Sequence, residues 1–183
     1  MRADAVRNHE KIVASAIEVF GERGVDAPLD DIATRAGVGP GTLYRHFPTR
    51  ESLIDAVVKS WFSQIDAAAE DAVASTAAPR DVLLTWFRAY VTRISHNKGG
   101  AAKITTAMGN ADSPIFSKCE ALRLANDRVL AHFRNDGIVR SDVDALEVCR
   151  IIGGVAVIAD QVGLEDPCVA SMLAVVVDGL LTT

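Results

Sequence analysis

Apolar residues recur at helical spacing along the whole chain, and this periodicity is the strongest constraint on its fold. In residues 8–23 the side chains of Ile12, Ala16 and Val19 fall three or four positions apart, as on one face of a helix. We find no convincing run in which polar and apolar residues alternate with the period of two that a half-buried strand requires. The sequence therefore predicts an all-α fold of about nine helices.

Residues that start or stop helices divide the chain into segments. Pro79 and the pair Asp166-Pro167 predict the first turns of two helices. Glycines that follow apolar segments predict the ends of helices. Ser141 with Asp144 three residues later resembles a capping box and predicts a further start. The expected helices span residues 8–23, 29–36, 40–47, 49–75, 79–96, 101–108, 113–135, 142–162 and 166–181.

Length, charge and cysteine content narrow the class of protein. The chain has 183 residues, a formal net charge of −5 and three widely spaced cysteines. A chain of this length buries roughly 70% of its unfolded surface, and without a CxxC motif neither a disulfide scaffold nor a cysteine zinc site is expected. The charge argues against a protein that coats nucleic acid or an anionic membrane. No metal, no cofactor, no signal peptide and no membrane partner is expected, and the free cysteines favour a cytoplasmic protein.

Residues 29–47, LDDIATRAGVGPGTLYRHF, have the pattern of a helix-turn-helix. Two short helices would cross at Ala33, and Gly37 supplies the positive φ that the turn between them needs. The second helix would then enter the major groove of DNA. Residues 35–50 contain three arginines and one histidine but no carboxylate, which predicts a local positive face in an acidic protein. The apolar anchors expected between the two helices are Ile32, Val38, Leu43 and Phe47.

Three strings in the first third of the chain together resemble the DNA-binding domain of the TetR family of bacterial transcription regulators. They are KIVASAIEVFGERG, DDIATRAGVGPGTLYRHF and TRESLIDAVV. Further along, CEALRLANDRVLAHFRNDGIVRSDVD resembles the SbtR-like subgroup of the family's ligand domains. The resemblance implies a DNA-binding domain over residues 1–48, with its helix-turn-helix at about 29–47, and a ligand-sensing and dimerisation domain over residues 49–183. A long helix over about 49–75 would link them.

The resemblance also implies which residues meet DNA. Many family members have Ser-Lys where this chain has Gly39-Pro40, so the recognition helix offers no side-chain donor before Thr42, and contacts from Arg45 become more important. Tyr44 could instead only pack and His46 could only cap the helix, and both alternatives stay open. The positions implied at base edges are Gly39, Pro40, Gly41 and Thr42. The side chains implied at phosphates are Tyr44, His46 and Arg50.

The C-terminal two-thirds supplies candidates for an effector site and a dimer surface. Pockets for small molecules are lined by apolar and aromatic groups with a few polar ones, although such residues are also ordinary core. The last two expected helices are apolar on more than one face, which favours a partner subunit packed in a four-helix bundle. The pocket candidates are Trp61, Trp86, Phe87, Tyr90, Met108, Phe116, Cys119, Leu122, Arg123 and Asn126. The dimer candidates are Ile151, Gly154, Val155, Ile158, Met172, Val176 and Leu180.

These expectations describe a ligand-responsive, sequence-specific DNA-binding regulator. It would repress from a palindromic operator as a homodimer and leave the operator when a small molecule binds, with the long helix coupling the two sites. The alternative is a helical adaptor that binds protein and keeps only a vestigial helix-turn-helix. An enzyme is not expected, because the chain has no HExxH, Walker or GxSxG motif and its four histidines lie on separate elements.

Overall fold

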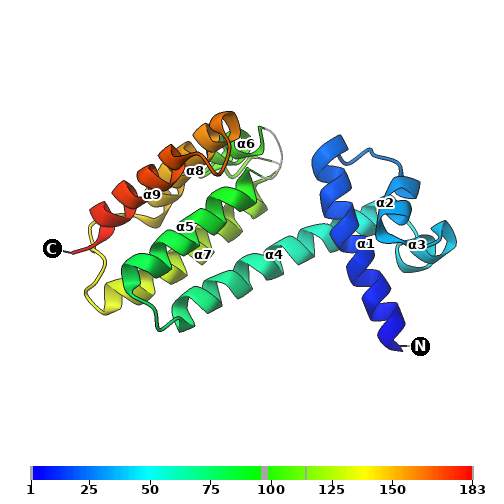
Figure 1. The fold of residues 1–183 in the computed structure, drawn as a ribbon, viewed down its shortest axis with the longest axis horizontal. Coiled ribbons are helices and arrows are strands. Elements are labelled where there is room, and N and C mark those ends of the chain that lie inside the picture. The colour runs from blue at the N-terminus through cyan, green and yellow to red at the C-terminus, as the bar shows by residue number, and fades with distance from the viewer. Residues whose placement is uncertain (1, 96–98, 114, 183) are drawn as a thin grey trace. The chain divides into compact units, whose positions relative to one another are not determined.

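The computed structural model of the chain describes residues 2–95, 99–113 and 115–182. Over these residues the chain forms nine helices and no strand, which confirms the all-α fold (Figure 1). The one extended pairing described is an isolated antiparallel bridge between Val139 and Leu181. The helices are α1 (Arg2–Arg23), α2 (Leu29–Ala36), α3 (Pro40–His46), α4 (Arg50–Ala74), α5 (Pro79–Ile94), α6 (Gly100–Ala107), α7 (Phe116–Asn135), α8 (Ala145–Val162) and α9 (Pro167–Leu180).

Most helix limits follow the local signals in the sequence. Pro79 and Pro167 open α5 and α9, and the Asp166 side chain accepts a hydrogen bond from the backbone N–H of Cys168. Gly37 ends α2 with a φ of 67°, the left-handed conformation that the turn requires. The expected end of α5 at His96 lies outside the described residues, as does Pro114 at the expected start of α7. The expected start of that helix at Ser113 is three residues early, because α7 begins at Phe116.

Two further expected helix starts are wrong. α8 begins at Ala145, because the capping box is made by Asp144 and Glu147 rather than by Ser141 and Asp144. The Asp144 carboxylate accepts from Leu146 N at 2.7 Å, and Glu147 Oε2 accepts from Asp144 N at 3.3 Å. α1 begins six residues before the expected start at Asn8, since its polar first turns are helical without showing apolar periodicity.

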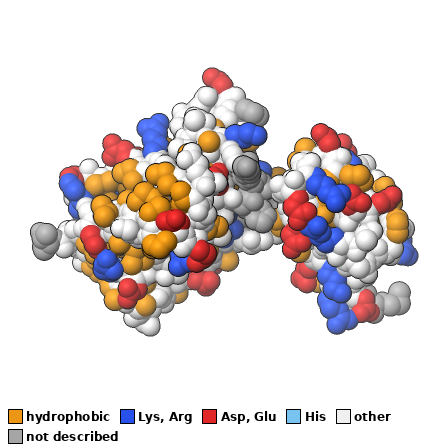
Figure 2. All heavy atoms as spheres, turned by 45° about the horizontal axis from the view of Figure 1, so that its top comes forward, with side chains coloured by type: hydrophobic (Ala, Val, Ile, Leu, Met, Phe, Trp, Pro, Cys, Tyr) orange, Lys and Arg blue, Asp and Glu red, His pale blue; other side chains and the backbone are white. Residues whose placement is uncertain are grey.

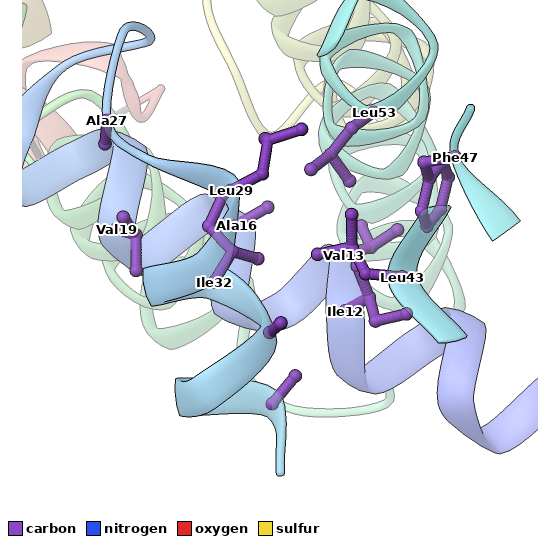
Figure 3. Packing of buried hydrophobic residues seen from close by; sticks show 12 residues of the cluster. Ile12, Val13, Ala16, Val19, Ala27, Leu29, Ile32, Leu43, Phe47 and Leu53 are labelled. Atoms are coloured by element: carbon purple, nitrogen blue, oxygen red, sulfur yellow. The ribbon is translucent and has the colours of Figure 1, made fainter. Parts of the chain in front are cut away.

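The N-terminal unit comprises residues 1–63 and is built on one cluster of buried side chains. Figure 3 shows residues from α1, α2, α3 and α4 pointing toward one another in this cluster. Ile12, Ile32, Leu43 and Leu53 are completely buried, so each of the four helices contributes a fixed anchor. The division between the units falls inside α4, because its first turns belong to this cluster.

The C-terminal unit comprises residues 64–183, and its core is formed by α5 to α9 and by the second half of α4, where Ile65 and Ala69 are buried. α6 packs on α8, and α5 packs on both α8 and α9. The α6–α8 approach is close at Gly153, where an added Cβ would lie 2.3 Å from Thr105 Oγ1. The bidentate pair of Arg80 with Asp178 joins α5 to α9 on the surface. No helix among the described residues is long and apolar enough to span a membrane.

Candidate functional site

The helix-turn-helix is held by its apolar anchors and leaves most of α3 uncovered. Leu43 and Phe47 are 0% and 3% exposed and fix α3 in the N-terminal core, and Ile32 does the same for α2. Every other residue of α3 is exposed or half-buried. The predicted base-edge and phosphate residues of α3 are therefore accessible, and their contacts with DNA stay a prediction.

The expected positive face over residues 35–50 is partly wrong, because carboxylates of α1 reach it. Arg35 pairs with Glu22 at 2.6 Å and lies 3.6 Å from Glu18. The hydrogen bond from Arg35 lowers the pKa of the Glu22 carboxyl and raises the pKa of Arg35 itself. On the N-terminal unit, acidic and basic side chains accordingly lie next to one another (Figure 2).

Arg50, a predicted phosphate contact, already has partners within the N-terminal unit. Its Nη1 donates to the backbone oxygens of Val25 and Ala27 at 2.6 and 2.7 Å. These bonds tie the first turn of α4 to the loop between α1 and α2, so the side chain stabilises that loop. A phosphate contact from Arg50 stays a prediction, and it would have to use the donors that remain.

The other polar side chains of α3 differ in how far they are engaged. Arg45 donates from Nε to Gly41 O and from Nη2 to Thr42 Oγ1, both at 3.1 Å. Tyr44 is 48% exposed, which leaves its ring and hydroxyl accessible. The His46 ring lies 6.2 Å from the ring of His9 on α1, measured between centroids.

Most predicted pocket residues lie in the core of the C-terminal unit. Trp86, Phe87, Tyr90, Met108, Cys119, Leu122 and Asn126 are buried, and Phe116 and Arg123 are half-buried. Trp61 belongs to the N-terminal unit. Arg123 pairs with Glu120 at 2.6 Å, so this expected anchor already has an acidic partner.

A small polar cluster lies within that core. Asn126 accepts from Trp86 Nε1 at 3.1 Å and donates to Ala145 O at 3.2 Å. The Tyr90 hydroxyl is buried without a hydrogen-bond partner of ordinary geometry, and burial raises the pKa of Tyr90 well above its usual value. Cys149 lies beside Tyr90 and Asn126, and burial raises the pKa of its thiol to about 11. The sequence reasoning missed Cys149, whose only signal was its place in an apolar helix.

The predicted dimer residues separate into accessible and covered ones. Val155 and Leu180 are 6% and 5% exposed, so they face the protomer's own core and the expectation that they form a surface is wrong. The accessible or half-buried members are Ile151, Gly154, Ile158, Met172 and Val176. Val162 and Val175, which the sequence reasoning did not select, are also exposed. Figure 2 shows the hydrophobic patch on this part of the C-terminal unit.

The described residues contain no group of three or more His, Cys, Asp or Glu side chains that could hold a metal ion.

Both parts of the chain match known protein families. Residues 12–57 match the family described as "Bacterial regulatory proteins, tetR family", and residues 78–182 match "Transcriptional regulator SbtR-like, C-terminal domain". The chain is 30% identical over 148 residues to the HTH-type transcriptional repressor KstR2 of Mycobacterium tuberculosis, covering 78% of this chain and 74% of that protein.

Solved structures of other proteins align with this chain over nearly its whole length. The TetR transcriptional regulator SCO0520 from Streptomyces coelicolor aligns with a TM-score of 0.75 and 29% identity, over 96% of this chain and 99% of that one. A TetR regulatory protein from Mycobacterium vanbaalenii aligns with a TM-score of 0.69 and 28% identity, over 99% of both chains. KstR2 of M. tuberculosis, described as a ketosteroid transcriptional regulator, aligns with a TM-score of 0.60 and 26% identity, over 96% of this chain and 95% of that one.

The fold, the helix-turn-helix and these matches define a ligand-responsive transcription regulator that binds DNA. Both of its parts match models of the same regulators, one for the DNA-binding end and one for the C-terminal domain. The chain belongs to the TetR family.

Proposed function

We propose that the protein is a repressor that binds a palindromic operator as a homodimer and is released by a small, largely apolar molecule. In this proposal residues 1–48 bind DNA, residues 49–183 sense the ligand and dimerise, and the protein acts in the cytoplasm. The observation that carries it is the anchored α2–α3 pair, which leaves one face of a short helix free for the major groove. α4 has residues in both units, which supports its role in coupling them.

Exposed groups of α3 support the DNA contacts. The Tyr44 hydroxyl and the His46 imidazole are donors that fit phosphate oxygens, and Gly39, Pro40 and Gly41 let the backbone approach the bases closely. A dimer would place two such helices about 34–36 Å apart, one turn of B-DNA.

The apolar surface of α8 and α9 supports the homodimer. Ile151 is 52% exposed, Ile158 39% and Val175 71%, although such residues are normally covered. Monomers rarely expose contiguous apolar patches larger than a few hundred Å², and a second copy is the partner that a symmetric regulator requires. The two helices would pair with their symmetry mates in a four-helix bundle.

The Tyr90 hydroxyl supports the chemistry of the effector. The buried Tyr90 hydroxyl has the Cys149 thiol, a weak hydrogen-bonding group, beside it. An effector bearing an oxygen acceptor would give this hydroxyl a stronger hydrogen bond, and such a bond typically contributes about 0.5–1.5 kcal/mol. The other predicted pocket residues are mostly apolar or aromatic, so the rest of the effector is expected to be apolar. The relative described as a ketosteroid regulator is consistent with such a ligand, and we propose steroid-like ketones as the first compounds to screen.

Selection of bound sequences from a random duplex library tests the proposal. The purified full-length protein should enrich an inverted repeat whose half-sites lie about 10 base pairs apart, centre to centre. A protein-binding adaptor would enrich no duplex, and any residual binding to DNA would lack a sequence preference. Tyr90→Phe then tests the effector site: it should fold and bind the selected operator as the parent does, while a ketone that releases the parent should release the variant only at higher concentration.

A further inference from the structure

The three arginines of residues 35–50 lie on three different helices and have different partners. Only one of them, Arg45, lies on α3. Arg35 is paired with Glu22, and Arg50 holds the backbone of the α1–α2 loop. Arg45 is exposed on α3 and has no acidic partner among the residues that the structure describes. The positive charge that α3 can offer to DNA is therefore concentrated at Arg45.

The internal bonds of Arg45 leave one complete edge of its guanidinium group open. Nε and Nη2 lie on one edge, and they donate to Gly41 O and Thr42 Oγ1 at 3.1 Å each. An arginine has five N–H donors, so three remain: two on Nη1 and one on Nη2. The outer edge thus presents two parallel N–H groups, one from Nη1 and one from Nη2. That spacing matches the O6 and N7 acceptors of guanine in the major groove.

The neighbouring residues make this edge the main side-chain reader of the helix. Gly39, Pro40 and Gly41 carry no side-chain donor or acceptor, so the first turn cannot read bases by side chains. Thr42 accepts from Arg45 and keeps its own hydroxyl proton for another acceptor. The two bonds also restrain a long flexible side chain before DNA arrives, which lowers the entropy lost on binding.

We propose that Arg45 selects a guanine in each half-site of the operator, through the Nη1–Nη2 edge of its guanidinium group. This inference rests on the proposed function, since it presupposes an operator. It assigns base specificity to a single side chain and predicts that guanine is the best-defined base of the half-site.

Selection from the random duplex library with the parent and with Arg45→Ala tests the assignment. The parent motif should contain one nearly invariant guanine per half-site, and the variant motif should lose the preference at that position. Affinity of Arg45→Ala for the parent operator should fall about 5- to 150-fold per half-site contact, with little change on unrelated duplexes. Arg45→Lys keeps the charge without the planar fork and should also lose most of the preference. Arg35→Ala removes a charge from the same unit and should leave the motif unchanged.

A modified base separates a base contact from a phosphate contact. Replacing that guanine by 7-deazaguanine removes the N7 acceptor, so parent affinity should fall about tenfold while Arg45→Ala should be indifferent. The assignment is overturned if Arg45→Ala keeps the parent motif, or if its affinity falls equally on every duplex. If the parent itself enriches no duplex, the proposed function fails together with this inference; a parent motif without a sensitive guanine rejects the inference alone.

Discussion

Two adjacent glycines in α8 offer a matched test of how closely α6 and α8 pack. A Cβ added at Gly153 would lie 2.3 Å from Thr105 Oγ1 and 2.9 Å from Thr105 Cγ2, while a Cβ at Gly154 meets nothing within 4 Å. Alanine in place of glycine stabilises a helix interior by roughly 1 kcal/mol at either position. Overpacking at Gly153 costs about 1–3 kcal/mol, because the Thr105 side chain is short and its hydroxyl donates to Ala101 O at 2.7 Å.

The helix-propensity contributions cancel when Gly153→Ala is compared with Gly154→Ala. Gly153→Ala should therefore unfold with a free energy about 1–3 kcal/mol lower than Gly154→Ala, a difference of about 0.5–1.5 M in the urea midpoint. Trp86 fluorescence, in a chain with Trp61→Phe, reports the unfolding of the C-terminal unit alone.

Thr105→Ala provides the control, because it removes both atoms that lie within 3 Å of the added Cβ. In that background the two alanine variants should differ by less than about 0.5 kcal/mol, and the double-mutant cycle should give most of the difference as coupling. Gly154 belongs to the proposed dimer surface, so each midpoint is measured at two protein concentrations; only an effect through the dimer changes with concentration. Equal stability of the two variants in the parent background would refute the close approach of α6 to α8.

Three further outcomes follow from particular contacts. Arg50→Met should lower the free energy of unfolding of the N-terminal unit by about 1.5–2 kcal/mol, since two backbone carbonyls lose a charged donor; an unchanged thermal midpoint would contradict this. Arg80 lowers the pKa of the Asp178 carboxyl, so this stabilisation is present above the unfolded value of about 3.9 and is lost as the pH falls through the lower folded pKa. Arg80→Met should accordingly be less stable than the parent in urea at pH 7, and the gap should close in acid. A thiol reagent at pH 8 should modify only Cys168, as mass spectrometry would show, and Asp166→Asn should speed the reaction because the Asp166 carboxylate raises the pKa of that thiol.

Local signals in the sequence predict most of the fold. Proline and aspartate at the start of α9 and glycine after α2 act within a few residues, so their effect can be deduced without a structure. The start of α8 was misplaced because two overlapping patterns compete there, and the longer side chain of Glu147 reaches back to the Asp144 backbone where the Ser141 pattern does not form.

The site is less predictable, because its side chains are engaged by residues distant in the sequence. Arg35 meets Glu22 thirteen positions away, and Arg50 meets Val25 twenty-five positions away, so a count of charges along the segment overestimates its positive face. In α8 both faces are apolar, and periodicity alone could not tell that Val155 faces inward while Ile151 faces outward.

The distribution of arginine partners bears on how an acidic regulator of this kind selects its site. A protein that neutralises many phosphates with arginine and lysine binds all DNA tightly, and its affinity falls steeply with salt. Here two of the three arginines near α3 are held by the protein, and the proposed phosphate contact from the Tyr44 hydroxyl carries no charge. Non-specific affinity should therefore be low and only weakly dependent on salt. Discrimination would then come from the base contact of Arg45 and from the simultaneous docking of two subunits, which is why a net charge of −5 is compatible with a sequence-specific DNA-binding protein.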